Sequence, residues 1–254
     1  MGELRPQIAN VMIDRSASLG FRSSCLTVAE VLGRMHRGEY MQLSDHVRPA
    51  CEPDRIIGIM DELMRGEPIT PFILWDVLPT AARGLDLQRV AYQFDERFGW
   101  ENLDDRVPEG RGVTVVLDGV QRLTALNIAA RGFYAQVLYT PRFWHCPPGI
   151  LCFRLSDDPA CGEPDFCFFV NGDYRLTQDG PVPWFPVPHV MSLCGEQDID
   201  RVLRHYGFAG DPRALERLWA LYEALKLRRS LHCSIITATE QDVGKARAIA
   251  DSVI

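Results

Sequence analysis

The chain has 254 residues, of which 46% are hydrophobic and 24% are charged, enough apolar material for one large core and too little charge for wholesale disorder. Its net charge of -7 argues against a surface built to coat nucleic acid, which needs an excess of Lys and Arg. No run approaches the roughly 20 apolar residues of a membrane span, and the N-terminus lacks the apolar segment of a signal peptide. We therefore expect no membrane partner and a cytoplasmic location.

Residues 1–24 have little periodicity, and we interpret them as an N-terminal arm. Helix and strand signals alternate along the chain after this arm. Thr27 followed three residues later by Glu30 forms a capping box, which predicts the start of a helix. The signals predict, in order, a helix over 28–36, a strand over 40–43, a helix over 54–65 and a strand over 71–77.

The middle of the chain begins with residues 78–112, which show no clear period, and we expect an insertion there with a short helix over 85–98. The β-branched run Val113–Leu117 then predicts a central strand. Asp118 and Gly119 end this strand, and a helix is expected over 121–131.

Beyond this helix, three strand candidates are separated by turns rich in Pro, Gly, Asp and Asn, which predicts a hairpin set. A proline-rich segment then predicts an extended edge strand, followed by two helices, a strand and a last helix capped by Thr239. These elements are expected over 134–139, 150–155, 166–170, 181–188, 196–206, 212–227, 233–237 and 239–254.

Together the elements predict an α/β (α+β) fold, with a mixed sheet, surrounding helices and a helical C-terminal portion. We divide the chain into the arm (1–24), a sheet-containing domain (25–190) and the helical portion (191–254). The last helix reaches Ile254 without the Gly, Lys or Arg that usually closes a helix, so we expect the native chain to continue.

The segment from Asp118 to Thr124 is the strongest candidate for a functional site. Gly119 permits a backbone conformation or a close approach that a side chain would prevent. The helix that follows directs its free N–H groups and positive dipole end at the turn, which is a general anion site. Arg122 can add a bidentate phosphate contact. Asp118 can hold a metal-bound water, orient a nucleophile or accept from a ribose hydroxyl, and Gln121 can position a water or a phosphate oxygen.

Spacing alone leaves a second interpretation open, because Asp-Gly is an ordinary turn and Arg is common near a helix start. The chain contains no G-x-x-x-x-G-K-[ST] phosphate loop. The run Val116–Leu126, however, resembles the (V/I)-(I/L)-D-G-Q-Q-R-L-T-(T/A)-L signature of the N-terminal domain family found in GmrSD-type restriction systems. Weaker similarities, to family segments before and after the signature, cover 65–74, 183–187 and the last helix.

The resemblance implies a fold related to ParB and sulfiredoxin and a role in prokaryotic defence against foreign DNA, including phage. It also implies nucleotide binding and, in some members, nucleoside-triphosphate hydrolysis. Carried over residue by residue, the implied site comprises Asp118, Gly119, Gln121 and Arg122. Many relatives carry a separate C-terminal HNH-type nuclease domain, and no such cluster is present here. Contact with DNA is therefore expected only through a further domain or a partner subunit.

Two positions depart from the family pattern. The first Gln of the signature is Val120 here, which removes one polar group from the turn. Upstream, the family's Q-R-x-Y-x-W element corresponds to Asp45–Cys51, where Arg48 retains the arginine but Val47 replaces the glutamine. Hydrolysis depends more on exact positioning than binding does, so it is the activity that these changes affect most.

Three other features are interpreted structurally. The eight cysteines include no C-x-x-C pair, so we expect free buried thiols and no metal site, although His145-Cys146 with later cysteines leaves zinc as a minor alternative. The basic group Lys226, Arg228 and Arg229 suits a helix C-terminus. A stripe of leucines at helical spacing is interpreted first as core packing and second as a partner interface; its members are Leu215, Leu218, Leu221 and Leu225.

Two functional hypotheses follow. In the first, the chain is a nucleotide-binding, NTP-hydrolysing sensor domain of a restriction-like system, with Mg²⁺ as the natural metal for phosphates and a carboxylate. Asp118, Gln121 and Arg122 would then be catalytic, and Gly119, Arg122 and Arg48 would bind the nucleotide. In the second, the chain is a non-catalytic module for protein or DNA interaction that keeps the fold. Homo-oligomer formation is compatible with both.

Overall fold

The computed structural model of the chain describes residues 21–44, 52–91, 93–95, 111–135, 138–139, 144–145, 148–156, 165–170, 184–237 and 241–252. Its elements in chain order are β1 (Phe21–Leu26), α2 (Val28–His36), β2 (Tyr40–Leu43), α3 (Pro53–Arg65), β3 (Ile69–Val77), α4 (Pro79–Ala82), β4 (Leu87–Arg89), β5 (Gln93–Asp95), β6 (Val113–Asp118), α5 (Val120–Arg131), β7 (Phe133–Ala135), β8 (Leu138–Tyr139), β9 (Trp144–His145), β10 (Pro148–Arg154), β11 (Phe166–Val170), β12 (Trp184–Pro186), the 3-10 helix η2 (Val187–Ser192), α6 (Glu196–His205), α7 (Pro212–Tyr222), the π-helix η3 (Glu223–Leu227), β13 (Leu231–Ile236) and α8 (Val243–Asp251).

The central feature is a six-stranded mixed sheet in the order β1-β13-β3-β6-β2-β4. β3 pairs in parallel with β13 and antiparallel with β6, and β6 pairs in parallel with β2. The outer strands β1 and β4 pair antiparallel with their neighbours. This arrangement confirms the expected mixed sheet with surrounding helices. It also places β13, from the C-terminal part of the chain, inside the sheet between β1 and β3.

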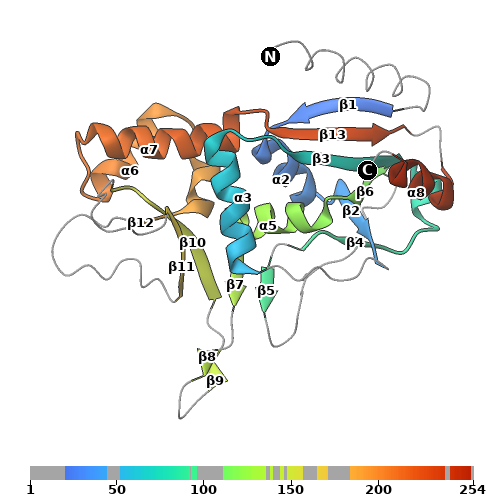
Figure 1. Cartoon of the computed structure of the whole chain (residues 1–254), viewed down its shortest axis with the longest axis horizontal. Coiled ribbons are helices and arrows are strands. Elements are labelled where there is room, and N and C mark those ends of the chain that lie inside the picture. The colour runs from blue at the N-terminus through green and yellow to red at the C-terminus, as the bar shows by residue number, and fades with distance from the viewer. Residues whose placement is uncertain are drawn as a thin grey trace, which may run out of the picture.

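A second, five-stranded sheet has the order β11-β10-β7-β5, with β12 also paired to β10. The antiparallel pairing of β10 with β11 and β7 confirms the expected hairpin set. The proline-rich segment contributes β12, where Phe185 lies opposite Phe153 of β10. Figure 1 shows helices α2, α3 and α5 lying between the two sheets.

Both faces of the six-stranded sheet are covered, so its central strands are buried on both sides. The larger core fills the space between the sheets and includes residues of α2, α3, α5, α6 and α7. The smaller core lies on the opposite face, where Ala82 of α4 and Ala246 and Ala250 of α8 pack on strand residues such as Trp75. Residues before and after the expected boundary at residue 190 therefore share one continuous core.

Local signals in the sequence explain where several helices begin and end. Thr27 accepts a hydrogen bond from the Glu30 N–H, and the Glu30 carboxylate accepts one from the Thr27 N–H, which confirms the capping box of α2. α3 ends at Gly66, whose φ of 74° is the left-handed conformation that favours glycine. Helix α5 is buried along most of its length, from Leu123 to Ala130, while Gln121 in its first turn is exposed.

Four expectations about elements need correction. Val187 and Pro188, expected at the end of the extended strand over 181–188, instead begin the 3-10 helix η2. The helix over 85–98 is wrong, because β4 and β5 lie within this range, β4 paired with β2 and β5 with β7. Residues 21–24, assigned to the arm, belong to β1. The cap of the last helix is Asp242, which accepts from the Lys245 N–H, rather than Thr239, which lies outside the described residues. No helix in the described ranges is both long and apolar enough to cross a membrane.

Candidate functional site

The turn between β6 and α5 is built around Gly119. Its φ of 89° and ψ of 8° are left-handed, a conformation that residues with a Cβ rarely adopt. A Cβ at this position would lie 2.2 Å from Cδ1 of Phe72 on β3. Glycine is thus required for two independent reasons, the backbone conformation and the contact with the Phe72 ring.

The strand that leads into the turn is irregular at its last residues. Ile73 of β3 lies opposite Asp118, whereas the next residue, Leu74, lies opposite Val116. Leu117 is therefore an extra residue in β6, which makes a β-bulge one position before Asp118. Bulges turn the strand and redirect the side chains next to them, so the register shift helps to set the position of the Asp118 carboxylate.

The charged side chains of the turn contact each other and an aromatic ring. Nη2 of Arg122 lies 3.0 Å from Oδ2 of Asp118, an ion pair one helical turn apart. The guanidinium carbon of Arg122 lies 5.5 Å from the centre of the Phe72 ring, within the range of a cation–π contact. The side chain of Arg122 is only 23% exposed and that of Asp118 is 37% exposed. Phe72 thus holds both the glycine backbone and the arginine.

The start of α5 lacks the side-chain cap that an N-cap residue often supplies. Gly119 is the N-cap residue and has no side chain, and no side-chain cap hydrogen bond is made there within the described residues. The first N–H groups of a helix lack partners within the helix, and its dipole places partial positive charge there. An uncapped helix start beside a guanidinium group can attract an anion such as a phosphate.

The structure brings together four of the five predicted site residues: Asp118 and Gly119 end the strand and form the turn, and Gln121 and Arg122 belong to the first turn of α5. Gln121 is exposed to solvent. Arg48 lies outside the described residues, as does the whole of 45–51.

Sequence reasoning missed Phe72, because nothing in its local pattern distinguishes it from other buried strand residues. Val120, the departure from the family signature, is only 8% exposed and belongs to the larger core. An apolar side chain suits this buried position, so Val120 contributes to core packing where the family signature has a glutamine.

The cysteine and histidine side chains form no second candidate site in the described ranges. There, no three His, Cys, Asp or Glu side chains lie close enough to hold a metal ion. Burial raises the pKa of the Cys152 and Cys233 thiols to about 12, which keeps them protonated and unsuited to nucleophilic attack. The Cys25 thiol donates to the carbonyl oxygen of Arg229 at 2.9 Å.

Comparison with protein-family models finds no match for this chain, and comparison with curated proteins finds none either.

Proposed function

We propose that the β6–α5 turn binds the phosphate groups of a nucleotide, and that the chain is a nucleotide-binding regulatory domain of a restriction-like defence system. The observation that carries the proposal is the left-handed Gly119 at the uncapped start of α5, with Arg122 held beside it on Phe72. This combination leaves backbone N–H groups and a guanidinium group close to one point.

The ion pair between Arg122 and Asp118 defines what binding requires. A phosphate that approaches the helix start competes with Asp118 for the guanidinium group. If the phosphate takes Arg122, the Asp118 carboxylate becomes available to a ribose hydroxyl, a water or a metal ion. Hydrolysis requires this exchange, and the exposed Gln121 could then orient the attacking water.

Mg²⁺ would enter this site together with the nucleotide. A single carboxylate is a sparse donor set for a metal, but Mg²⁺ commonly uses one or two carboxylates together with substrate phosphates and water. In this scheme Asp118 is the protein ligand, and the chemistry that the metal supplies is neutralisation of phosphate charge. Arg122 and the backbone N–H groups of α5 carry the binding.

The proposal is tested by the thermal stability of the chain with ATP, GTP, CTP and UTP, each with and without Mg²⁺. A nucleotide at 100 times its dissociation constant should add about 2.7 kcal/mol, which raises the melting temperature by about 5–10 °C. Arg122→Ala should abolish the shift. Arg131→Ala is the matched control, because it removes the same charge from the exposed last residue of the same helix.

Two outcomes would count against the proposal. If no nucleotide stabilises the wild-type chain, the turn does not bind one in this chain. If a nucleotide stabilises the wild-type and Arg122→Ala chains equally, it binds elsewhere.

The second candidate function, a non-catalytic interaction module, is favoured by a different observation. Part of α7 leaves large apolar side chains exposed, Leu215 and Trp219 at 37% each. The leucine stripe of α7 and η3 otherwise packs inward, since Leu218, Leu221 and Leu225 are fully buried. The core interpretation of the stripe is confirmed for these three residues, whereas Leu215 is exposed and the partner-interface interpretation stays a prediction for it.

A further inference from the structure

The outer surface of α7 and η3 carries three of the exposed large apolar side chains in the described ranges. Leu215 and Trp219 are four residues apart and so lie on one face of the helix. Leu227, at the end of η3, is 51% exposed. The π-helical stretch has more residues per turn than the α-helix, which brings Leu227 back toward the face of Leu215 and Trp219.

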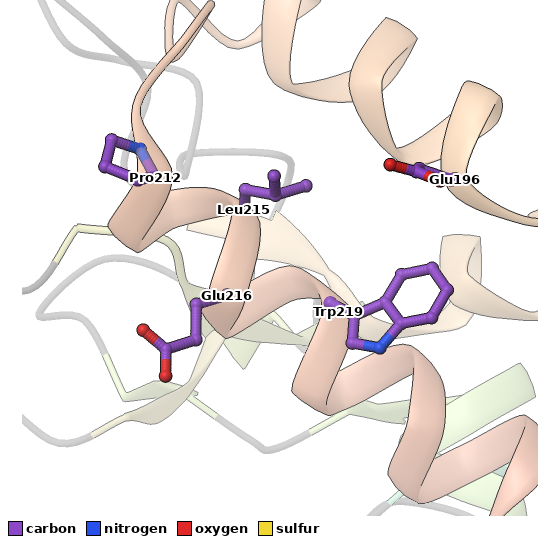
Figure 2. Close-up of a pocket in the computed structure, with 5 residues that line it drawn as sticks. All are labelled: Glu196, Pro212, Leu215, Glu216 and Trp219. Carbon is purple, nitrogen blue, oxygen red and sulfur yellow. The ribbon is translucent and has the colours of Figure 1, made fainter.

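Leu215 and Trp219 line an open groove of about 350 Å³ together with Glu196, Pro212 and Glu216. Figure 2 shows Leu215 and Trp219 pointing from α7 toward the side where Glu196 lies, while the Glu216 carboxylate extends on the opposite side. The apolar side chains are therefore flanked by a carboxylate on each side, and none of the five lining residues is basic.

The carboxylates of Glu196 and Glu216 differ from their neighbours in having no partner among the described residues. On α6, Asp198 pairs with Arg201 and Asp200 pairs with Arg204. Glu196 and Glu216 make no ion pair within the part of the chain that the structure describes. An apolar surface bordered by two uncompensated negative charges is complementary to an apolar side chain that has basic neighbours.

The same chain presents such a segment at the end of η3. The exposed Leu227 stands in the sequence Lys226-Leu227-Arg228-Arg229. Lys226 and Arg228 are engaged within the chain, with the Met191 carbonyl oxygen and with Glu223. The Arg229 side chain is exposed and makes no ion pair within the described ranges.

We propose that two copies of this chain associate through this surface, with Leu227 and Arg229 of each copy docked on Trp219 and Glu216 of the other. If the two α7–η3 segments lie antiparallel about a two-fold axis near Glu223, Trp219 of one copy faces Leu227 of the other, and Glu216 comes close to Arg229. Such a self-complementary contact is the usual form of a two-fold dimer. Glu223 near the axis is already neutralised by Arg228 of its own chain, 3.1 Å away.

The association should be weak and should depend on protein concentration. A contact between one pair of helices buries less surface area than a stable interface, which buries about 1,200–2,000 Å². Sedimentation velocity of the whole chain over a wide concentration range measures it directly. The wild-type chain should shift from monomer to dimer. Glu216→Arg and Arg229→Glu should each raise the dissociation constant at least about tenfold, because each places like charges opposite each other.

The decisive step is to mix these two single variants. In the heterodimer, each substituted residue meets an opposite charge and the unchanged pair is also restored, so the mixture should dimerise as the wild-type chain does. Arg55→Glu, the same charge reversal at an exposed position of α3, is the matched control and should leave association unchanged. Trp219→Ala should weaken the dimer, and Leu78→Ala, at an exposed leucine outside this surface, should not.

A wild-type chain that stays monomeric at every concentration overturns the proposal and leaves the groove to a basic segment of another protein. A dimer that Glu216→Arg and Trp219→Ala leave unchanged also overturns it, because the copies then meet elsewhere. Both results are independent of nucleotide binding at the β6–α5 turn.

Discussion

Replacing Gly119 by alanine tests whether the candidate turn depends on glycine for the reasons given by its geometry. Forcing an L-residue into the left-handed conformation costs about 1–2 kcal/mol. Pressing a methyl group into the Phe72 ring, 2.2 Å from its Cδ1 atom, adds an overpacking cost of about 1–3 kcal/mol. The lower entropy of the unfolded alanine chain returns about 0.4–1 kcal/mol. The variant should therefore lose roughly 1–5 kcal/mol of unfolding free energy.

Gly210 provides a matched control, because its φ is 74° and no atom of the described residues lies within 4 Å of a Cβ at that position. Gly210→Ala shares the two backbone effects and lacks the contact with a ring. Urea unfolding of both variants should show Gly119→Ala to be less stable than Gly210→Ala by about 1–3 kcal/mol. Introducing Gly119→Ala into a Phe72→Leu chain should reduce this difference. Equal losses in the two glycine variants would refute the role assigned to Phe72.

Three further predictions concern stability and reactivity elsewhere in the chain. Thr27→Ala removes the capping box of α2 and should cost about 1 kcal/mol in urea unfolding; an unchanged midpoint would contradict the assignment. Arg228→Ala removes a hydrogen bond of 3.0 Å to the Leu63 carbonyl oxygen and should cost about 1–3 kcal/mol, with partial recovery in Arg228→Lys. Burial raises the pKa of Cys152 to about 12, so the folded thiol keeps a proton that the unfolded thiol, with a pKa of about 8.5, loses. Unfolding free energy should thus fall as pH rises above about 8.5, less so in Cys152→Ala; iodoacetamide should modify exposed Cys194 in the folded chain but Cys152 only after unfolding.

The sequence predicts most elements whose signals are local. The capping box at Thr27, the glycine at Gly66 and the β-branched run before Asp118 each act through neighbouring residues. For this reason the bounds of α2, α3 and β6 agree closely with expectation. The mixed sheet with helices around it also follows from the alternation of these elements.

Elements that depend on distant partners could not be predicted in the same way. β4 and β5 are three residues long and exist because β2 and β7 pair with them, while their own sequence has no strand period. The sequence of β13 predicts a strand, but its position between β1 and β3 depends on the tertiary fold of the whole chain.

The candidate site shows the same division. Asp118, Gly119, Gln121 and Arg122 are adjacent in sequence, so the motif alone places them in one turn. Phe72 comes from another strand, and its contact with Gly119 and Arg122 appears only in three dimensions.

The most direct test of the central claim is to record backbone amide resonances of the isotope-labelled chain while the stabilising nucleotide is added. If the turn binds phosphate, the largest shifts should occur at Val120, Gln121 and Arg122, whose N–H groups form the start of α5. These shifts should disappear in Arg122→Ala and persist in Arg131→Ala. Shifts confined to other parts of the chain, or no shifts at saturating nucleotide, would contradict the account.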